Sequence, residues 1–223
     1  MQLLLARRVN GHKISDHVVF VGATNDTKHM AGVAGMLEPV KSRWHSIVSL
    51  EVSLDDWCVW ALDHGQPAEI VAFVRFRPGL LHDFQPTREL INSPCPRTVA
   101  EVGKWLNIGE RSRDVIAGAA GEAFAIELTA FLQMYGSLPN LDSILLNPEQ
   151  ALVPTEPATL YAVITGLARK ATPGNAERLF RYLKRLDKEF QVCCVHDIDR
   201  TAPPVRETRA YIDWSVRNAD AVS

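Results

Sequence analysis

The chain has 223 residues, of which 47% are hydrophobic and 22% are charged, and its formal net charge is −2. This composition fits a globular protein of one large or two small domains, and the slight negative charge gives no indication of nucleic acid or an anionic membrane as partner. No apolar run approaches the roughly 18 residues of a membrane span, the N-terminal charges follow the apolar residues, unlike those of a signal peptide, and four cysteines without paired spacing indicate a reducing cytoplasm.

The beginning of the chain predicts a helix, a hairpin and a strand. Residues 1–8 include three consecutive leucines and predict a helix, although no capping residue precedes them. Asn10-Gly11 is a strong turn signal for a hairpin. Residues 18–21, Val-Val-Phe-Val, are rich in the β-branched residues of a buried strand. We therefore expect a hairpin that leads into a strand.

Polar groups follow this strand at positions that suit phosphate chemistry. The apolar run ends in small polar residues that include Asn25, and ligands of parallel α/β sheets bind beyond the carboxyl ends of the strands. A short helical turn over residues 37–41 leads to Arg43 and then to a second strand over residues 45–52. An amide at one strand tip and an arginine at the foot of the next predict an anion site.

The remainder of the chain predicts helices. Ser53 and Asp56 have capping-box spacing. Apolar periodicity predicts two helices between residues 53 and 77, broken at residues 65–67, and further helices over residues 98–106, 115–135, 160–167, 173–190 and 211–216. The small residues 118–121 would let another helix or a ligand approach closely. Three prolines within residues 148–157 mark a linker or domain boundary.

Several motifs favour structural roles over chemistry. Gly103-Lys104 is the one Gly-Lys pair, but a threonine stands where a phosphate loop needs its first glycine and a tryptophan where it needs Ser or Thr. Asp55 and Asp56 could deliver carboxylates to Mg²⁺ from a strand, but they are better explained as acidic residues in the first turn of a helix.

The cysteines and a basic helix face have similar explanations. Cys193-Cys194 with His196 is too compressed for tetrahedral zinc spacing, and Cys58 and Cys95 are interpreted as packing residues. A basic helix face around Arg181 is interpreted as solvated, with a partner or nucleic-acid surface as the alternative.

A third arginine adds to the anion hypothesis. Pro94-Cys95-Pro96-Arg97 places Arg97 at the start of a helix after a proline-stiffened loop. Helix N-termini attract anions, and a guanidinium there can make a bidentate phosphate contact.

Taken in order, these segments resemble the carboxyl-terminal half of an AAA+ ATPase, most like the MoxR-like branch. The strand that ends at Asn25 is similar to sensor 1, whose polar residue orients the attacking water near the γ-phosphate. Residues 36–44 are similar to the segment that ends in an arginine and an aromatic residue, with Arg43 as the arginine finger. Residues 94–97 are similar to the sensor 2 motif, with Arg97 opening a helix of the lid domain.

The resemblance covers roughly residues 1–150 and implies an incomplete ATPase. The family's phosphate loop, Walker B carboxylates and first strands would all precede Met1, so we expect a truncated product, an alternative start or one piece of a split enzyme. In the intact family ATP and Mg²⁺ lie between subunits of a ring, commonly a hexamer. The resemblance implies that Arg43 acts in trans, that Asn25 positions water in cis, and that Arg97 couples nucleotide to the lid.

The expected fold class is therefore an α/β remnant of a P-loop NTPase core, followed by a mainly α-helical lid and a C-terminal helical region. The expected domains are residues 1–52 (core), 53–147 (lid) and 148–223 (extension). The expected function is the sensor, arginine-finger and lid portion of an ATPase that remodels a client protein, as part of a homo-oligomeric ring or with a partner subunit that carries the phosphate loop. The alternative is a catalytically inactive helical interaction module.

Overall fold

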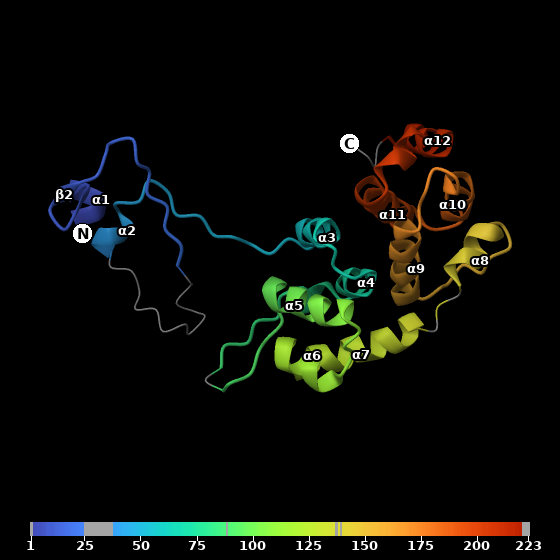
Figure 1. Ribbon diagram of the computed structural model, residues 1–223, viewed down its shortest axis with the longest axis horizontal. Coiled ribbons are helices and arrows are strands. Elements are labelled where there is room, and N and C mark those ends of the chain that lie inside the picture. The colour runs from blue at the N-terminus through green and yellow to red at the C-terminus, as the bar shows by residue number, and fades with distance from the viewer. Residues whose placement is uncertain (1, 25–37, 88, 137, 139, 220–223) are drawn as a thin grey trace. The chain divides into compact units, whose positions relative to one another are not determined.

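The computed structural model describes residues 2–24, 38–87, 89–136, 138 and 140–219, which form a mainly helical protein with one small hairpin (Figure 1). Contacts divide the chain into two units. The N-terminal unit comprises Met1–Glu51 and Pro86–Leu90, and the helical unit comprises Val52–Gln85 and Ile91–Ser223. The expected three-domain division at residues 52 and 147 stays a prediction. None of the described helices combines the length and apolar character needed to cross a bilayer.

The N-terminal unit confirms the predicted helix, hairpin and helical turn. Its elements are α1 (Gln2–Ala6), β1 (Arg8–Val9), β2 (His12–Lys13) and α2 (Glu38–Lys41). The two strands pair antiparallel, with Val9 opposite His12. Asn10 and Gly11 have φ values of 48° and 84°, the left-handed conformation that a tight hairpin turn requires. The local turn chemistry was therefore sufficient to predict this hairpin.

The two strands expected at residues 18–21 and 45–52 are not formed, which corrects these two strand predictions, whereas the mainly helical part of the expected fold class is confirmed. In the described part of the chain the strands are the paired β1 and β2, and both apolar runs are irregular. Val19 and Val21 remain 83% and 93% exposed, and Leu50 remains 95% exposed. A strand is defined by its hydrogen-bonded neighbour. Residues 18–21 and 45–52 have the apolar composition of strands, but no described segment forms hydrogen bonds with either run as a neighbouring strand.

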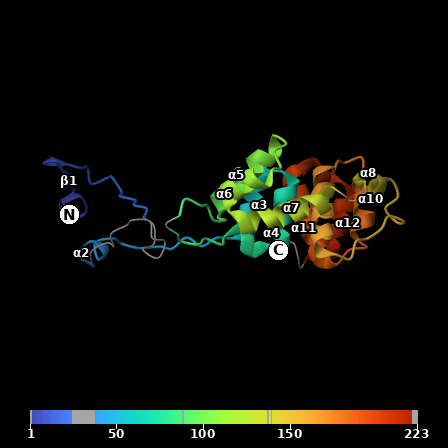
Figure 2. The ribbon, with the colours of Figure 1, turned by 90° about the horizontal axis from the view of Figure 1, so that it is seen from below.

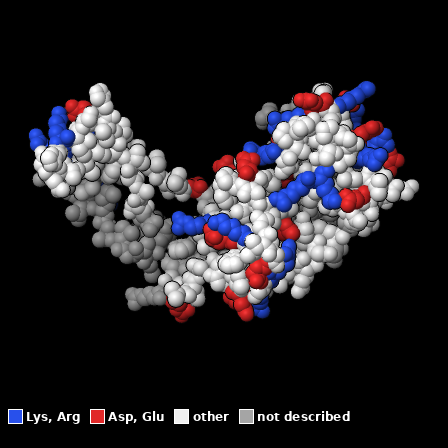
Figure 3. All heavy atoms as spheres, in the orientation of Figure 1, with Lys and Arg blue, Asp and Glu red and all other residues white. Residues whose placement is uncertain are grey.

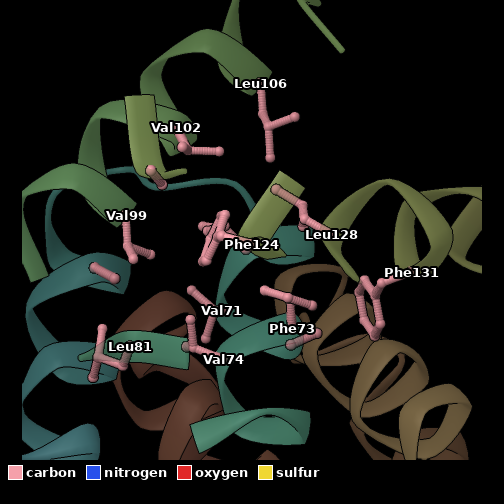
Figure 4. Packing of buried hydrophobic residues seen from close by; sticks show 14 of the residues in the cluster. Val71, Phe73, Val74, Leu81, Val99, Val102, Leu106, Phe124, Leu128 and Phe131 are labelled. Atoms are coloured by element: carbon pink, nitrogen blue, oxygen red, sulfur yellow. The ribbon is translucent and has the colours of Figure 1, made fainter. Parts of the chain in front are cut away.

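The helical unit contains two apolar clusters, and the first is formed by the helices that follow residue 53. These elements are α3 (Leu54–Asp63), α4 (Ala68–Phe76), η2 (Pro78–Leu81), α5 (Pro96–Asn107), α6 (Arg113–Ala120) and α7 (Glu122–Gly136). Figure 4 shows Phe73 of α4 beside Phe124 and Phe131 of α7. The Phe73 ring meets these two rings edge-on at centroid distances of 5.3 and 5.5 Å, which is a favoured aromatic geometry.

The second cluster is formed by the C-terminal helices around α9. Its elements are α8 (Leu141–Leu146), α9 (Pro157–Arg169), α10 (Ala176–Leu183), α11 (Lys188–Thr201), η3 (Pro203–Glu207) and α12 (Arg209–Arg217), which lie together in both ribbon views (Figures 1 and 2). The predicted stripe of α9, from Leu160 to Leu167, is buried. On the same helix, Ala158 and Ala162 belong to the first cluster, so α9 contributes to both clusters.

Two of the expected helices are each broken into two. The helix predicted over residues 173–190 begins only after a turn in which Asn175 accepts a hydrogen bond from the Thr172 amide, and a second turn at residues 184–187 divides it into α10 and α11. The helix predicted over residues 115–135 breaks at Gly121, whose φ is 92°. A Cβ at Gly121 would lie 2.7 Å from the Asn92 carbonyl oxygen, so the small residue permits a loop, rather than a helix or a ligand, to approach.

Gly103 also has a packing role. A Cβ at this position of α5 would lie 1.8 Å from Oε1 of the buried Gln66, whose backbone carbonyl accepts a hydrogen bond from Arg169. We predict that Gly103→Ala lowers the free energy of unfolding by about 1 kcal/mol, because the end of the buried Gln66 side chain must move out of a packed position. Urea unfolding followed by tryptophan fluorescence measures the change.

Gly118→Ala is the matched control. Gly118 lies on the exposed side of α6, and a Cβ there meets no atom within 4 Å. This change should leave stability unchanged or raise it by up to about 1 kcal/mol, since alanine favours a helix interior. Equal destabilisation by the two substitutions would contradict the packing role of Gly103.

Candidate functional site

The three residues expected to bind nucleotide are not assembled into one site in the described structure. Asn25 lies outside the described residues. Arg43 belongs to the N-terminal unit and Arg97 to the helical unit. Each arginine is therefore considered in its own surroundings.

Arg43 lines a hollow of about 510 Å³ in the N-terminal unit. The walls are formed by apolar residues of α1, by residues 19–22 and by Val40, and Arg43 is the one charged side chain among the described residues that line it. A Cβ on Gly22 would lie 3.0 Å from the Trp44 ring, so Trp44 packs closely against the end of the first apolar run. Residues 19–22 and Arg43 therefore line one hollow, although the two strands that were expected to bring them together are not formed.

Two donors of the residues that line this hollow lack partners. Arg43 Nε and Trp44 Nε1 are buried, and neither makes a hydrogen bond with a described residue. A buried donor without an acceptor costs about 1–3 kcal/mol. The Arg43 guanidinium, as the one charge among the described lining residues, favours an anion in the hollow.

Arg97 occupies the second position of α5, and the surrounding contacts fix its backbone. Pro96 opens the helix, and its carbonyl accepts a 3.1 Å hydrogen bond from Trp57 Nε1. Thr98 Oγ1 accepts a 2.8 Å hydrogen bond from the Cys95 amide, as in a capping box. The Arg97 side chain is exposed and makes no ion pair with a described residue. Its guanidinium is free to meet an anion.

Sequence reasoning missed a buried ion pair at the centre of the helical unit. Arg75 of α4 donates two hydrogen bonds of 2.6 Å to the two carboxylate oxygens of Asp197 on α11, and a third of 3.4 Å to Thr165 on α9. The Arg75 and Asp197 side chains are 12% and 2% exposed. A signal was present, because each charge lies on an otherwise buried helix face.

This pair is suited to structure rather than to proton transfer. Burial alone would lower the pKa of Arg75, but the hydrogen bonds and charge of Asp197 raise it above its ordinary value. The guanidinium therefore stays charged at any ordinary pH and cannot act as an acid. Bidentate geometry fixes the positions of both side chains.

Three thiols lie near this pair. Burial raises the pKa of Cys58 to about 11 and that of Cys193 to about 12, and it raises that of Cys194 as well. Cys194 Sγ donates to the Ile164 carbonyl at 3.4 Å. No group of three or more His, Cys, Asp or Glu side chains suited to a metal occurs among the residues that the structure describes. The buried Cys58 agrees with its interpretation as a packing residue.

A second hollow, of about 450 Å³, lies among α3, α11 and η3. Two of its arginines already have carboxylate partners, since Arg200 lies 3.3 Å from Asp63 and Arg206 lies 2.9 Å from Asp199. These paired charges are exposed and leave no uncompensated charge of either sign that would favour a ligand.

The basic face around Arg181 is also used within the chain. Arg181 pairs with Glu177 at 2.7 Å, and Arg185 donates to the carbonyls of Pro148 and Ala151. On the face shown in Figure 3, Lys and Arg are interspersed with Asp and Glu over the helical unit. These contacts favour the interpretation of a solvated face over a partner or nucleic-acid surface. They also attach Arg185, just after α10, to the proline-rich loop before α9.

No protein-family model matches the chain, and searches of the curated proteins and of the solved structures find no match either. The case for a function therefore rests on the residues of the chain itself.

The buried ion pair leads to a stability prediction. Asp197→Ala should lower the free energy of unfolding by about 3–5 kcal/mol, because it leaves the Arg75 charge buried and unpaired. Replacing both residues, Arg75→Met with Asp197→Leu, should cost less than this single change. Urea unfolding monitored by tryptophan fluorescence compares the variants.

Asp213→Ala is the control for this experiment. Asp213 and Arg209 form an exposed pair at 3.7 Å on α12. Its removal should change stability by less than about 0.5 kcal/mol. If the double variant were less stable than Asp197→Ala, the unpaired-charge explanation would be wrong.

The thiols lead to a second prediction. At pH 8 less than about 1% of Cys58 and Cys193 should be thiolate, because burial raises each pKa well above that pH. Ellman's reagent should therefore label the buried Cys58 and Cys194 only when urea unfolds the protein, whereas the partly exposed Cys95 should react first and the partly exposed Cys193, with its raised pKa, slowly. Cys95→Ser should remove the early phase, and rapid native labelling of this variant would contradict the assignment.

Proposed function

We propose that the chain is the sensor, arginine-finger and lid portion of a cytoplasmic MoxR-like AAA+ ATPase. In this proposal the N-terminal unit is a remnant of a P-loop NTPase core and the helical unit contains the lid. The chain would couple ATP binding and hydrolysis to the remodelling of a client protein. It would do so in a ring, or with a partner subunit that carries the phosphate loop.

The observation that carries the proposal is the position of Arg97. Its backbone is fixed in the first turn of α5 by Pro96 and by the Thr98 hydrogen bond, while its side chain is exposed without an ion-pair partner among the described residues. A rigid helix start and a free guanidinium are the two requirements for holding a phosphate group. The lid can then move with the nucleotide, because α5 is packed into the first cluster through Val99, Val102 and Leu106.

Arg43 supports the same proposal as an arginine finger. It makes no ion pair with a described residue, and Nε is buried without an acceptor. A guanidinium held beside packed apolar groups can approach the phosphate of a neighbouring subunit and stabilise charge during phosphoryl transfer. Asn25 would position the attacking water in this scheme.

Arg97 would donate to phosphate oxygens of the chain's own ATP, and Arg43 to those of the ATP of a neighbouring subunit. Mg²⁺ would neutralise charge on the phosphates when bound, and we assign its ligands to the partner that carries the phosphate loop. The residues of this chain would orient and stabilise, and would neither activate the nucleotide nor hold the metal.

An inactive helical interaction module is the second candidate. It is favoured by the exposed apolar runs of the N-terminal unit, in which Val19, Val21 and Leu50 are each more than 80% exposed. Such patches mark surfaces that bind other proteins. The two candidates differ in whether Arg43 affects ATP turnover.

The purified chain alone should hydrolyse no ATP. Mixed with the phosphate-loop subunit that co-purifies with it from its source cells, it should raise ATP turnover, measured by phosphate release. Arg43→Ala should lower this stimulated turnover by about 10³-fold or more, as the loss of an arginine finger does. Arg97→Ala should raise the ATP concentration that gives half-maximal turnover, because a phosphate contact is lost.

Arg209→Ala serves as the matched control, because the Arg209 side chain is 94% exposed on α12 and lies outside the proposed site. It should leave turnover unchanged. ATP hydrolysis by the chain alone, or stimulated turnover that survives Arg43→Ala, would disprove the assigned roles. Binding to a partner without any effect on turnover would support the interaction module.

A further inference from the structure

The N-terminal unit leaves two runs of apolar side chains exposed instead of burying them in a core of its own. Val19 and Val21 are 83% and 93% exposed, and Ile47, Val48 and Leu50 are 70%, 79% and 95% exposed. Single exposed apolar residues are ordinary on a protein surface. Several exposed apolar residues close together in the sequence mark an interaction surface. These two runs are therefore candidates for contact with another polypeptide.

The backbone of the same runs lacks hydrogen-bond partners. Within the described residues, the main-chain groups of residues 19–22 and 45–51 make no hydrogen bond, and neither run is helical. Unpaired main-chain donors and acceptors along an apolar run form a template for an added strand. Adjacent Ile47 and Val48 would face opposite sides of such a strand, as in strands covered on both faces.

The hollow beside residues 19–22 indicates the charge of the added strand. Arg43 is the one charged residue among its described lining residues, and Arg43 Nε and Trp44 Nε1 are buried without acceptors. A carboxylate can accept a charge-assisted hydrogen bond from the Arg43 guanidinium and neutralise it. Charge complementarity therefore favours an acidic occupant over a neutral or basic one.

We propose that residues 19–22 bind an extended apolar strand of another polypeptide, and that a carboxylate on that strand is held by Arg43. This inference deepens the proposed function, because it names the surface through which the chain meets its partner. Strand binding needs no nucleotide, so it is tested separately from the ATPase role.

The test uses two fluorescein-labelled peptides, Lys-Lys-Gly-Val-Thr-Ile-Val-Val-Asp-Gly and the same peptide with Asn in place of Asp. Fluorescence anisotropy with the full chain should show saturable binding of the Asp peptide, and about fivefold weaker binding of the Asn peptide, as the loss of a charge-assisted hydrogen bond does. Arg43→Gln should reduce this ratio to about one. Hydrogen exchange should show protection of the amides of residues 19–22 when the Asp peptide binds.

Variants of the strand template complete the test. Val19→Lys with Val21→Lys should abolish binding, and these exposed positions should tolerate lysine without unfolding, which circular dichroism checks. Ile108→Lys is the matched control, since Ile108 is 73% exposed at the end of α5, and it should bind as the unchanged chain does.

Three results would overturn the inference. The first is the absence of saturable binding up to about 1 mM peptide. The second is binding that survives the two lysine substitutions. The third is a dimer in analytical ultracentrifugation that these substitutions dissociate, because the occupant would then be a second copy of this chain.

Discussion

The hydrogen-bonded pair of Arg75 and Asp197 is the constraint on which the helical unit depends. It joins α4 of the first apolar cluster to α11 of the second, and it also reaches Thr165 on α9, which contributes to both clusters. An apolar contact tolerates small shifts between helices, whereas a bidentate pair does not. A sliding of α4 against α11 would leave one charge buried without its partner. The pair therefore selects one arrangement of the two clusters among several that would bury similar apolar area.

This fixed arrangement gives the exposed groups of the helical unit a rigid base. Trp57, whose indole donates to the Pro96 carbonyl at the start of α5, lies one residue before Cys58 in α3. The N-terminus of α5 is thus anchored to α3, and the loop before it is held by Asn92, whose side chain donates to the Gly118 carbonyl at 2.7 Å. Arg97 extends from this anchored position, so packing fixes the place of its backbone while its side chain is exposed.

The parts of the fold that follow from local chemistry could be predicted from sequence, and the parts that need distant partners could not. Asn10-Gly11 forms its turn from its own backbone preferences, and Ser53 caps α3 through a residue three positions away. The prediction of a strand at residues 18–21 was wrong. A β-branched composition indicates that a run is able to pair, but it does not show that a neighbouring strand exists. The Arg75 and Asp197 pair joins residues 122 positions apart, so periodicity on either helix could show a misplaced charge but not its partner. For the candidate site, the sequence could name Arg43 and Arg97 as candidate anion ligands, whereas the side chains around each became visible only in the packed structure.

Arg43 has a part in both proposals, and the two parts compete. It is the one charged side chain among the described residues that line the hollow of the N-terminal unit. A strand carboxylate bound there would neutralise the guanidinium, and a neutralised guanidinium stabilises the charge of phosphoryl transfer less well. Strand binding and the finger role would therefore alternate instead of acting together. Under this arrangement a partner that presents the acidic strand would lower the contribution of Arg43 to ATP turnover.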